Sequence, residues 1–217
     1  MKAAPLIGIS RHRLSTDGEG VTTLVAFHGC PLRCKYCLNP QSLHSEDIWK
    51  HYDCGQLYEE VKQDELYFLA THGGITFGGG EPCLQSDFID EFRQLCGQEW
   101  QLSVETSLNV AQENIEKLVP VVDSYIIDIK DINNAIYQKY TGKDNEKVLH
   151  NLQYLIDHGK NEQIIVRTPV IPAYNTENDV DYSIRLLKEM GITQFDRFTY
   201  KTCLLYTSPS PRDPKTS

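Results

Sequence analysis

Short runs of apolar residues alternate with amphipathic stretches along most of this chain. In residues 86–96, Phe88, Ile89 and Phe92 fall on one face at the spacing of an α-helix. Helices of this kind are predicted over residues 55–70, 86–96, 111–118, 145–158 and 178–190. The apolar runs between them predict six strands, over residues 22–28, 74–77, 101–106, 124–130, 163–170 and 194–200.

Strands and helices that follow one another in turn are typical of a parallel sheet, because each return to the next parallel strand needs a crossover. Six strands without a change of pattern predict an α/β fold, in the first place a partial (β/α)6 barrel of residues 1–200. A doubly wound sheet, with helices on both faces, is the alternative.

The periodic pattern stops at Lys201. Residues 201–217 contain three prolines and three serines, and their sequence resembles the adapter read-through found in translated metagenomic fragments. We expect this segment to be non-native and the domain to be truncated after its sixth strand. A disordered native tail is the alternative.

Charge and composition narrow the possible functions. The chain has 217 residues, of which 40% are hydrophobic, and a formal net charge of −9. This balance argues against a nucleic-acid binder with a broad basic face. No apolar run approaches the ~20 residues that span a bilayer, and residues 1–13 lack the apolar core of a secretory signal. We therefore expect a cytoplasmic protein, monomeric, that binds neither a membrane nor nucleic acid.

The seven cysteines are expected to stay reduced in that compartment, which favours metal binding or catalysis over disulfides. Cys30, Cys34 and Cys37 have the spacing C-x3-C-x2-C and follow the first predicted strand. Three neighbouring thiolates can hold three irons of a [4Fe–4S] cluster and leave the fourth iron open to a substrate. A zinc site with His28 or His44 as the fourth ligand is an alternative, and so are three unrelated cysteines.

The other cysteines of the predicted domain are expected to be structural. Cys96 lies on the apolar face of its helix, and Cys54 lies at a helix start. Cys83 follows a run of glycines and is the one placed to line a pocket.

Polar residues gather near the ends of the predicted strands, which meet at one rim of a parallel barrel. The second strand leads into three glycines and Glu81, and glycines let a ligand approach the backbone. Glu105 lies near the end of the third strand. Asp128 and Lys130 are two residues apart and point to one face of the fourth strand, where charges are costly unless paired or functional. Arg167 is the basic residue of the fifth strand, and a buried ion pair is its structural explanation.

With these residues the chain resembles the radical SAM superfamily, whose signature is a three-cysteine loop in a partial βα-barrel. The resemblance extends over nearly all of residues 1–200. It implies a [4Fe–4S] cluster on the three cysteines, with S-adenosylmethionine (SAM) bound at the open iron and cleaved to a 5′-deoxyadenosyl radical. Tyr36 and Leu38, on either side of Cys37, are expected to contact the cofactors.

The resemblance also implies SAM contacts at the strand ends. Gly79, Gly80 and Glu81 match the glycine-glycine-glutamate loop that binds the methionine amino group in the superfamily. Arg167 corresponds to an arginine that approaches the SAM carboxylate or ribose. Glu105 is also expected to reach SAM, in a segment, Glu-Thr-Ser-Leu, that departs from the Asp-Thr-Asn-Gly of many activating enzymes.

The sequence Asp128-Ile129-Lys130 resembles the Asp-Leu-Lys motif of the enzymes that activate glycyl-radical enzymes, among them the pyruvate formate-lyase activating enzymes. Tyr140-Thr-Gly and Asn151-Leu continue this resemblance. All three residues of the motif are expected to contact SAM, and Lys130 is expected to take part in catalysis.

The implied activity is that of a radical SAM oxidoreductase that abstracts hydrogen from a backbone glycine of a partner enzyme. Flavodoxin or ferredoxin is the implied electron donor. A single cluster is expected, because Cys54 is the one cysteine between Cys37 and Gly74. A radical SAM enzyme that modifies a small molecule or a peptide is one alternative, and a non-enzymatic zinc module is another.

Overall fold

The computed structural model describes residues 3–14 and 17–200. The predictions for residues 201–217 lie outside the described part of the chain.

One eight-stranded sheet, in the order β3-β1-β2-β4-β5-β6-β7-β8, forms the centre of the molecule. From β2 onward each neighbouring pair is parallel, whereas β1 runs antiparallel to both β2 and β3. The strands are β1 (Ala4–Leu14), β2 (Val21–Phe27), β3 (Lys50–Tyr52), β4 (Gly74–Gly79), β5 (Gln101–Thr106), β6 (Ser124–Asp128), β7 (Ile164–Val170) and β8 (Gln194–Thr199).

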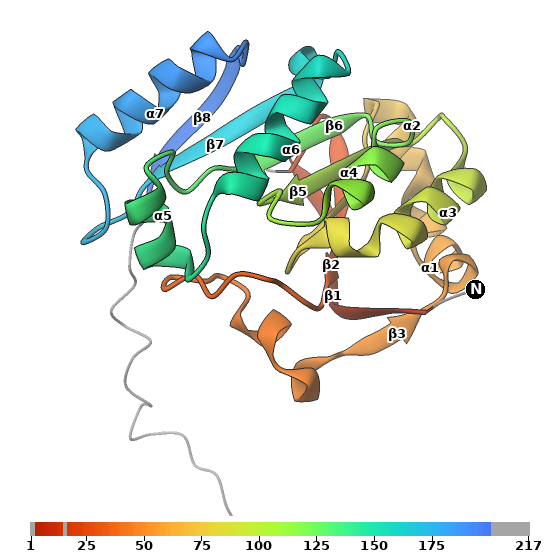
Figure 1. The fold of residues 1–217 in the computed structure, drawn as a ribbon. Helices are drawn as coiled ribbons and strands as arrows, with labels where there is room; N and C mark the ends of the chain where they lie inside the picture. Colours follow the sequence, from red (N-terminus) through yellow and green to blue (C-terminus); the bar gives the residue numbers. More distant parts are fainter. Residues whose placement is uncertain (1–2, 15–16, 201–217) are drawn as a thin grey trace, which may run out of the picture.

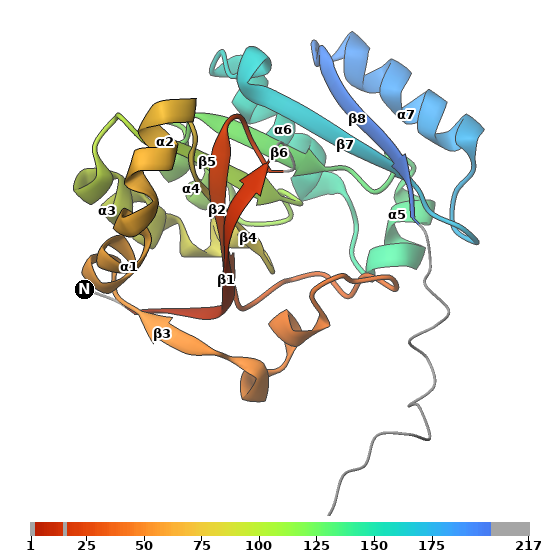
Figure 2. The same ribbon diagram turned by 180° about the vertical axis from the view of Figure 1, so that it is seen from behind.

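The helices pack around the outside of this curved sheet, and its inner side is left open (Figures 1 and 2). They are α1 (Cys54–Val61), α2 (Glu65–Thr71), α3 (Ser86–Cys96), α4 (Gln112–Leu118), α5 (Asn134–Thr141), α6 (Glu146–Asp157) and α7 (Glu177–Glu189). The strand order does not close into a ring, since β3 and β8 are the two edges. The predicted partial barrel is therefore confirmed, and helices on one side exclude the doubly wound alternative.

The period-two alternation of the strands separates an apolar outer face from a polar inner face. Phe77, Val104 and Ile127 are fully buried on the outer face, where the helices cover them. Phe77 packs edge-on against Phe92 of α3, with 5.6 Å between the ring centroids. Residues one position along, such as Ser103 and Glu105 of β5, point to the inner side instead, so the inner face carries the polar groups.

Two strands and one helix were not predicted. β1 and β3 form the antiparallel edge, and β1 carries charged residues where an apolar alternation would have revealed it. The register of β1 against β2 also shifts between Ser10 and Arg13, around His12 with its positive φ of 55°. α5 has only eight residues and is started by Asn133, whose side chain accepts a hydrogen bond from Ala135 N.

The single helix predicted over residues 55–70 is wrong in its middle. α1 ends at Val61, a 3-10 turn spans Lys62–Asp64, and α2 follows. Asp64 is fully buried in this turn, and Arg11 of β1 and Thr23 of β2 donate hydrogen bonds to its carboxylate. The interruption thus places the Asp64 carboxylate where it links the two helices to β1 and β2.

Candidate functional site

A pocket lies at the carboxyl ends of the parallel strands, where the loops that follow them meet. Polar groups from four strand ends and the three clustered cysteines share it. Its lining consists of Cys30, Leu32, Cys34, Tyr36, Cys37, Leu38, Asn39, Ser42, Gly79, Gly80, Glu105, Thr106, Ser107, Asp128, Lys130 and Tyr200.

The loop that follows β2 holds the three cysteines. Two backbone hydrogen bonds tie it to the end of α5, from Arg33 N to Thr141 O at 2.8 Å and from Lys35 N to Tyr140 O at 3.2 Å. All three thiols are free and lie partly buried at the pocket. Burial raises the pKa of Cys30 to about 12, with Glu81 adding to the shift, and burial likewise raises the pKa of Cys34. Metal binding at this loop must therefore release protons.

The three thiols are a donor set that fits a [4Fe–4S] cluster. Each thiolate can bind a different iron of the cube, and the fourth iron then stays open. Cys30, Cys34 and Cys37 all line the same pocket.

The glycines at the end of β4 are required by the close approach of the cysteine loop. A Cβ on Gly80 would lie 2.2 Å from Gly29 O, and one on Gly79, whose φ is +92°, would lie 2.8 Å from Ala26 Cα. Gly80 N and Glu81 N donate to Phe27 O and Gly29 O at 2.9 and 2.8 Å. The glycine loop and the start of the cysteine loop therefore form one rigid unit beside the pocket.

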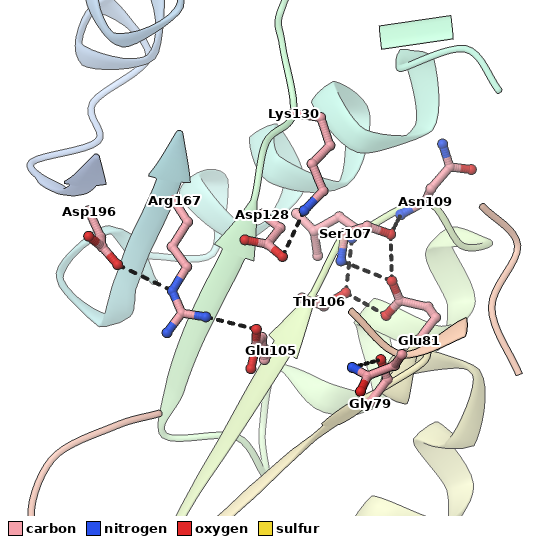
Figure 3. Close-up of polar contacts among 12 residues, drawn as sticks. Gly79, Glu81, Glu105, Thr106, Ser107, Asn109, Asp128, Lys130, Arg167 and Asp196 are labelled. Carbon is pink, nitrogen blue, oxygen red and sulfur yellow. Dashed lines mark hydrogen bonds and ion pairs between the residues drawn. The ribbon is translucent and has the colours of Figure 1, made fainter. Parts of the chain in front are cut away.

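Glu81 is buried, and its carboxylate is directed at the end of β5 (Figure 3). Its Oε1 accepts from Thr106 Oγ1 at 2.5 Å, and its Oε2 accepts from Ser107 N at 2.9 Å and Ser107 Oγ at 2.6 Å. Cys83 N donates to Oε1 as well, at 3.2 Å. This side chain joins two strand ends and does not line the pocket, so its direct contact with SAM stays a prediction.

Three ion pairs lie along the inner face below the rim (Figure 3). Arg167 Nη1 is 2.7 Å from Glu105 Oε1, and Arg167 Nε is 3.4 Å from Asp196 Oδ2. Lys130 Nζ is 3.0 Å from Asp128 Oδ2. Glu105, Asp128 and Lys130 line the pocket, whereas Arg167 lies behind Glu105 and supports it.

These groups shift one another's protonation. Burial raises the pKa of Glu105, the charge of Asp128 raises it further, and Arg167 opposes both. Burial alone would lower the pKa of Lys130, but Asp128, Tyr200 and Cys34 together outweigh it and hold that pKa well above its usual value. The pocket thus contains a buried ammonium ion next to two carboxylates that repel each other, an arrangement suited to an ionic ligand.

Some predicted positions face away from the pocket. The side chain of Ile129 is buried in the apolar core, and only its backbone takes part, with N donating to Arg167 O at 3.0 Å. Cys83 is fully buried and donates to Thr106 Oγ1 at 3.3 Å, so it does not line the pocket. Cys96 is only partly buried, against the edge of the core.

Several pocket residues were missed in the sequence. Asn39 follows Cys37 by two residues, and its Nδ2 donates to Gly79 O at 2.9 Å, which links the two loops. Ser42 and Tyr200 also line the pocket. No spacing rule identifies them, although a polar residue directly after a ligand loop was a usable signal for Asn39.

Tyrosine rings support the cysteine loop from the side of α5. Tyr36 contacts Tyr140 and Tyr174 edge-on, with ring centroids 6.1 and 5.8 Å apart, and those two are 5.1 Å apart. Three mutual aromatic contacts fix the loop against α5 and the segment after β7.

In the part of the chain that the structure describes, no helix is both long and apolar enough to cross a bilayer.

Comparison with known proteins supplies independent information on the family of this chain. Residues 24–196 match the family described as Radical SAM superfamily. The (2S)-3-sulfopropanediol dehydratase activating enzyme of Klebsiella oxytoca is 30% identical over 81% of this chain and 74% of the relative. The pyruvate formate-lyase-activating enzyme of Listeria monocytogenes is 30% identical over 88% of this chain and 80% of the relative.

Among solved structures, Streptococcus suis SuiB bound to S-adenosylmethionine aligns with a TM-score of 0.64 at 14% identity. The alignment covers 85% of this chain and 43% of that chain, and it shows a shared fold.

Proposed function

Because this chain belongs to the radical SAM superfamily, we propose that it is an activating enzyme that generates a glycyl radical on a partner enzyme. The observation that carries the proposal is the single pocket shared by Cys30, Cys34 and Cys37 and by the polar ends of β4, β5 and β6. Its cofactors are a [4Fe–4S] cluster and SAM. When bound, the cluster supplies the electron that cleaves SAM to a 5′-deoxyadenosyl radical, which can take hydrogen from a glycine.

Different residues of the pocket hold different parts of the cofactors. Cys30, Cys34 and Cys37 each bind one iron as thiolates, so their protons must leave when the cluster is built. Gly79 and Gly80 line the same pocket and let a ligand come close to the backbone. Tyr36 and Leu38 border the same space.

The charged residues orient SAM. The ammonium of Lys130 is buried and held by Asp128, so it is positioned to neutralise a carboxylate of the ligand. Glu105, backed by Arg167, is the negative counterpart for the SAM amino group or sulfonium. Fixed charges of this kind keep a reactive radical next to its target, because a misplaced radical reacts with whatever lies nearest.

The partner class follows from the relatives, whose names describe activation of a dehydratase and of pyruvate formate-lyase. We infer a glycyl-radical enzyme as the protein substrate, a flavodoxin or ferredoxin as the electron donor, and a cytoplasmic, monomeric protein.

The proposal is tested with protein purified and reconstituted with iron and sulfide without oxygen. We expect about four irons per chain, a broad visible absorption, and cleavage of SAM to methionine and 5′-deoxyadenosine after reduction with dithionite. An iron content near eight or twelve would contradict the single-cluster prediction. A zinc protein without visible absorption would contradict the whole proposal.

The protein substrate is tested by mixing the reduced, SAM-loaded protein with pyruvate formate-lyase or sulfopropanediol dehydratase. Growth of a glycine-centred signal in electron paramagnetic resonance is the expected result. SAM cleavage without such a signal for any glycyl-radical enzyme would favour an enzyme that modifies a small molecule or a peptide.

A further inference from the structure

Four cationic side chains gather where the cysteine loop meets α5. All four are exposed on the surface. Residues 30–43 and 132–143 contain these four and no carboxylate, although the whole chain has a net charge of −9. We call them the basic patch: Arg33, Lys35, Lys139 and Lys143.

Backbone contacts bring the two halves of the patch together. Arg33 N donates to Thr141 O, and Lys35 N donates to Tyr140 O, so the loop and the end of α5 lie side by side. A Cβ on Gly142 would lie 4.0 Å from Arg33 Cβ. Figure 1 shows the cysteine loop passing directly below α5. The patch is therefore a continuous surface across two segments.

The patch is held in place relative to the cysteines. Arg33 Nη1 donates to Cys30 O at 2.9 Å and to Leu32 O at 2.8 Å, which fixes the guanidinium over the loop. Lys139 Nζ lies 5.5 Å from the centre of the Tyr174 ring. Arg33 thus places one charge of the patch directly beside Cys34, a ligand of the proposed cluster.

None of the four cations lines the pocket. A polypeptide that presents a glycine to the radical must enter the pocket, whereas an electron donor needs only to come close to the cluster from outside. A positive surface on the outer side of the cysteine loop therefore suits a donor better than a substrate. Asp144, which is exposed, marks its border.

We propose that the basic patch docks an acidic one-electron carrier protein, and this inference rests on the proposed function. In the step it serves, a reduced flavin or iron–sulfur centre of the carrier loses one electron, and the oxidised cluster of this chain gains it. No covalent bond forms or breaks between the two proteins. Complementary charge steers such encounters and raises their rate by about 10- to 1,000-fold at low ionic strength.

The test compares two charge-reversed double variants in the full chain. Lys139→Glu with Lys143→Glu alters the patch. Lys62→Glu with Lys188→Glu makes the same change of net charge at two exposed lysines, next to α1 and on α7. Binding of flavodoxin is measured by calorimetry at low and high salt, and electron transfer from reduced flavodoxin is measured by stopped flow.

The patch variant is expected to bind flavodoxin about 10-fold or more weakly, with a flatter salt dependence, while the control stays within about 2-fold of the original protein. Cleavage of SAM with dithionite is expected to be equal in all three proteins. A milder pair, Lys139→Gln with Lys143→Gln, is expected to show a smaller loss in the same direction and covers the case in which charge reversal disturbs α5.

Unchanged flavodoxin binding in both patch variants, or an equal loss in the control, would overturn the inference. Weaker binding of a glycyl-radical enzyme, with flavodoxin unaffected, would overturn it in favour of a substrate surface. Failure of the original protein to cleave SAM with dithionite would count against the proposed function alone, because flavodoxin binding still reports on the patch.

Discussion

Two regions of this molecule bury charged groups, and the pKa of the buried carboxylate is shifted in opposite directions in the two regions. Asp64, below the edge of the sheet, is surrounded by Arg11, by His12 at 2.9 Å and by Thr23 at 2.9 Å. Burial alone would raise the pKa of Asp64, but the hydrogen bonds from Arg11 and Thr23 outweigh it and hold the pKa below its usual value. In the pocket, Glu105 lies near a second carboxylate, and its pKa is raised.

The difference separates a structural charge from a functional one. Around Asp64 the donors are complete, and its carboxylate joins β1, β2 and the turn between α1 and α2. Around Glu105 and Asp128 the charges are only partly compensated, and the side chains border an open pocket. Unfavourable charge is retained where a ligand can satisfy it, which is typical of binding sites. We therefore expect damage at one region to unfold the protein and damage at the other to spare the fold.

The largest expected effect on cofactor binding comes from Cys34→Ala. Loss of one thiolate ligand should remove the visible absorption of the reconstituted protein and reduce SAM cleavage by at least about 100-fold, because the cube keeps only two protein ligands. The free energy of unfolding of the metal-free protein should change by no more than about 1 kcal/mol. Cys96→Ala is the matched control and should retain the cluster. Equal iron in both variants would contradict the assigned ligand.

Asp64→Ala should give the largest loss of stability, about 2–3 kcal/mol, since it leaves the buried Thr23 hydroxyl without its acceptor and the partly exposed Arg11 guanidinium without its partner. Glu105→Gln is the comparison in the pocket. It should cost under about 1 kcal/mol, because the fold raises the pKa of Glu105 and so disfavours its charged form, and Arg167 keeps its ion pair with Asp196, while SAM binding weakens. Urea unfolding and calorimetry with SAM measure the two effects. Similar destabilisation by both variants would erase the distinction between the regions.

Glu81 links the two kinds of region, since it is buried like Asp64 and yet adjoins the pocket. If it acts by holding Ser107, then Glu81→Gln and Ser107→Ala should each weaken SAM binding by roughly 10-fold, and the double variant should lose little more. The expected coupling is about 1 kcal/mol. Additive losses would show instead that Glu81 contacts SAM independently of Ser107. Calorimetric titration of the reconstituted variants with SAM decides between them.

The smallest expected effect is on the pH dependence of stability. Asp64 has a lowered pKa, so its contribution is present above pH 3.8 and is lost as the pH falls below that value. Glu105 has a raised pKa, so the folded state binds its proton more tightly, and stability declines as the pH rises above 4.5. Glu105→Gln should remove that decline in urea unfolding measured across this pH range. An unchanged decline would assign it to another group.

Most strands of the fold follow from the local pattern of apolar residues. The six parallel strands were predicted within a few residues, because apolar residues recur within each of them, and the outer face buries those residues in all but the edge strand β8. β1 was missed because Arg11 and Arg13 interrupt its pattern, and the partner of Arg11, Asp64, comes from a distant part of the chain. The break after α1 was missed for the same reason, since Asp64 looks like a solvent-exposed helix residue until Arg11 and Thr23 surround it.

The chain at the end of β5, the third predicted strand, departs from the sequence motif of many activating enzymes at Leu108. Leu108 stands where many activating enzymes have a glycine, and it adopts a φ of +56° while fully buried. A leucine in this region carries strain. It is retained because its side chain packs in the core and Asn151 Nδ2 donates to its carbonyl oxygen at 2.9 Å.

The amino-acid sequence by itself predicted Cys30, Cys34 and Cys37 as cluster ligands. It also predicted the parallel order of the βα units and membership of the radical SAM superfamily, which the structure and the comparisons confirm. These features are local, because they depend on spacing and on the period of apolar residues. Only the tertiary structure decided that Glu81 turns toward Ser107, that Arg167 supports Glu105, and that the end of α5 joins the cysteine loop. Those arrangements depend on contacts between residues far apart in the chain, and neither spacing nor periodicity carries information about them.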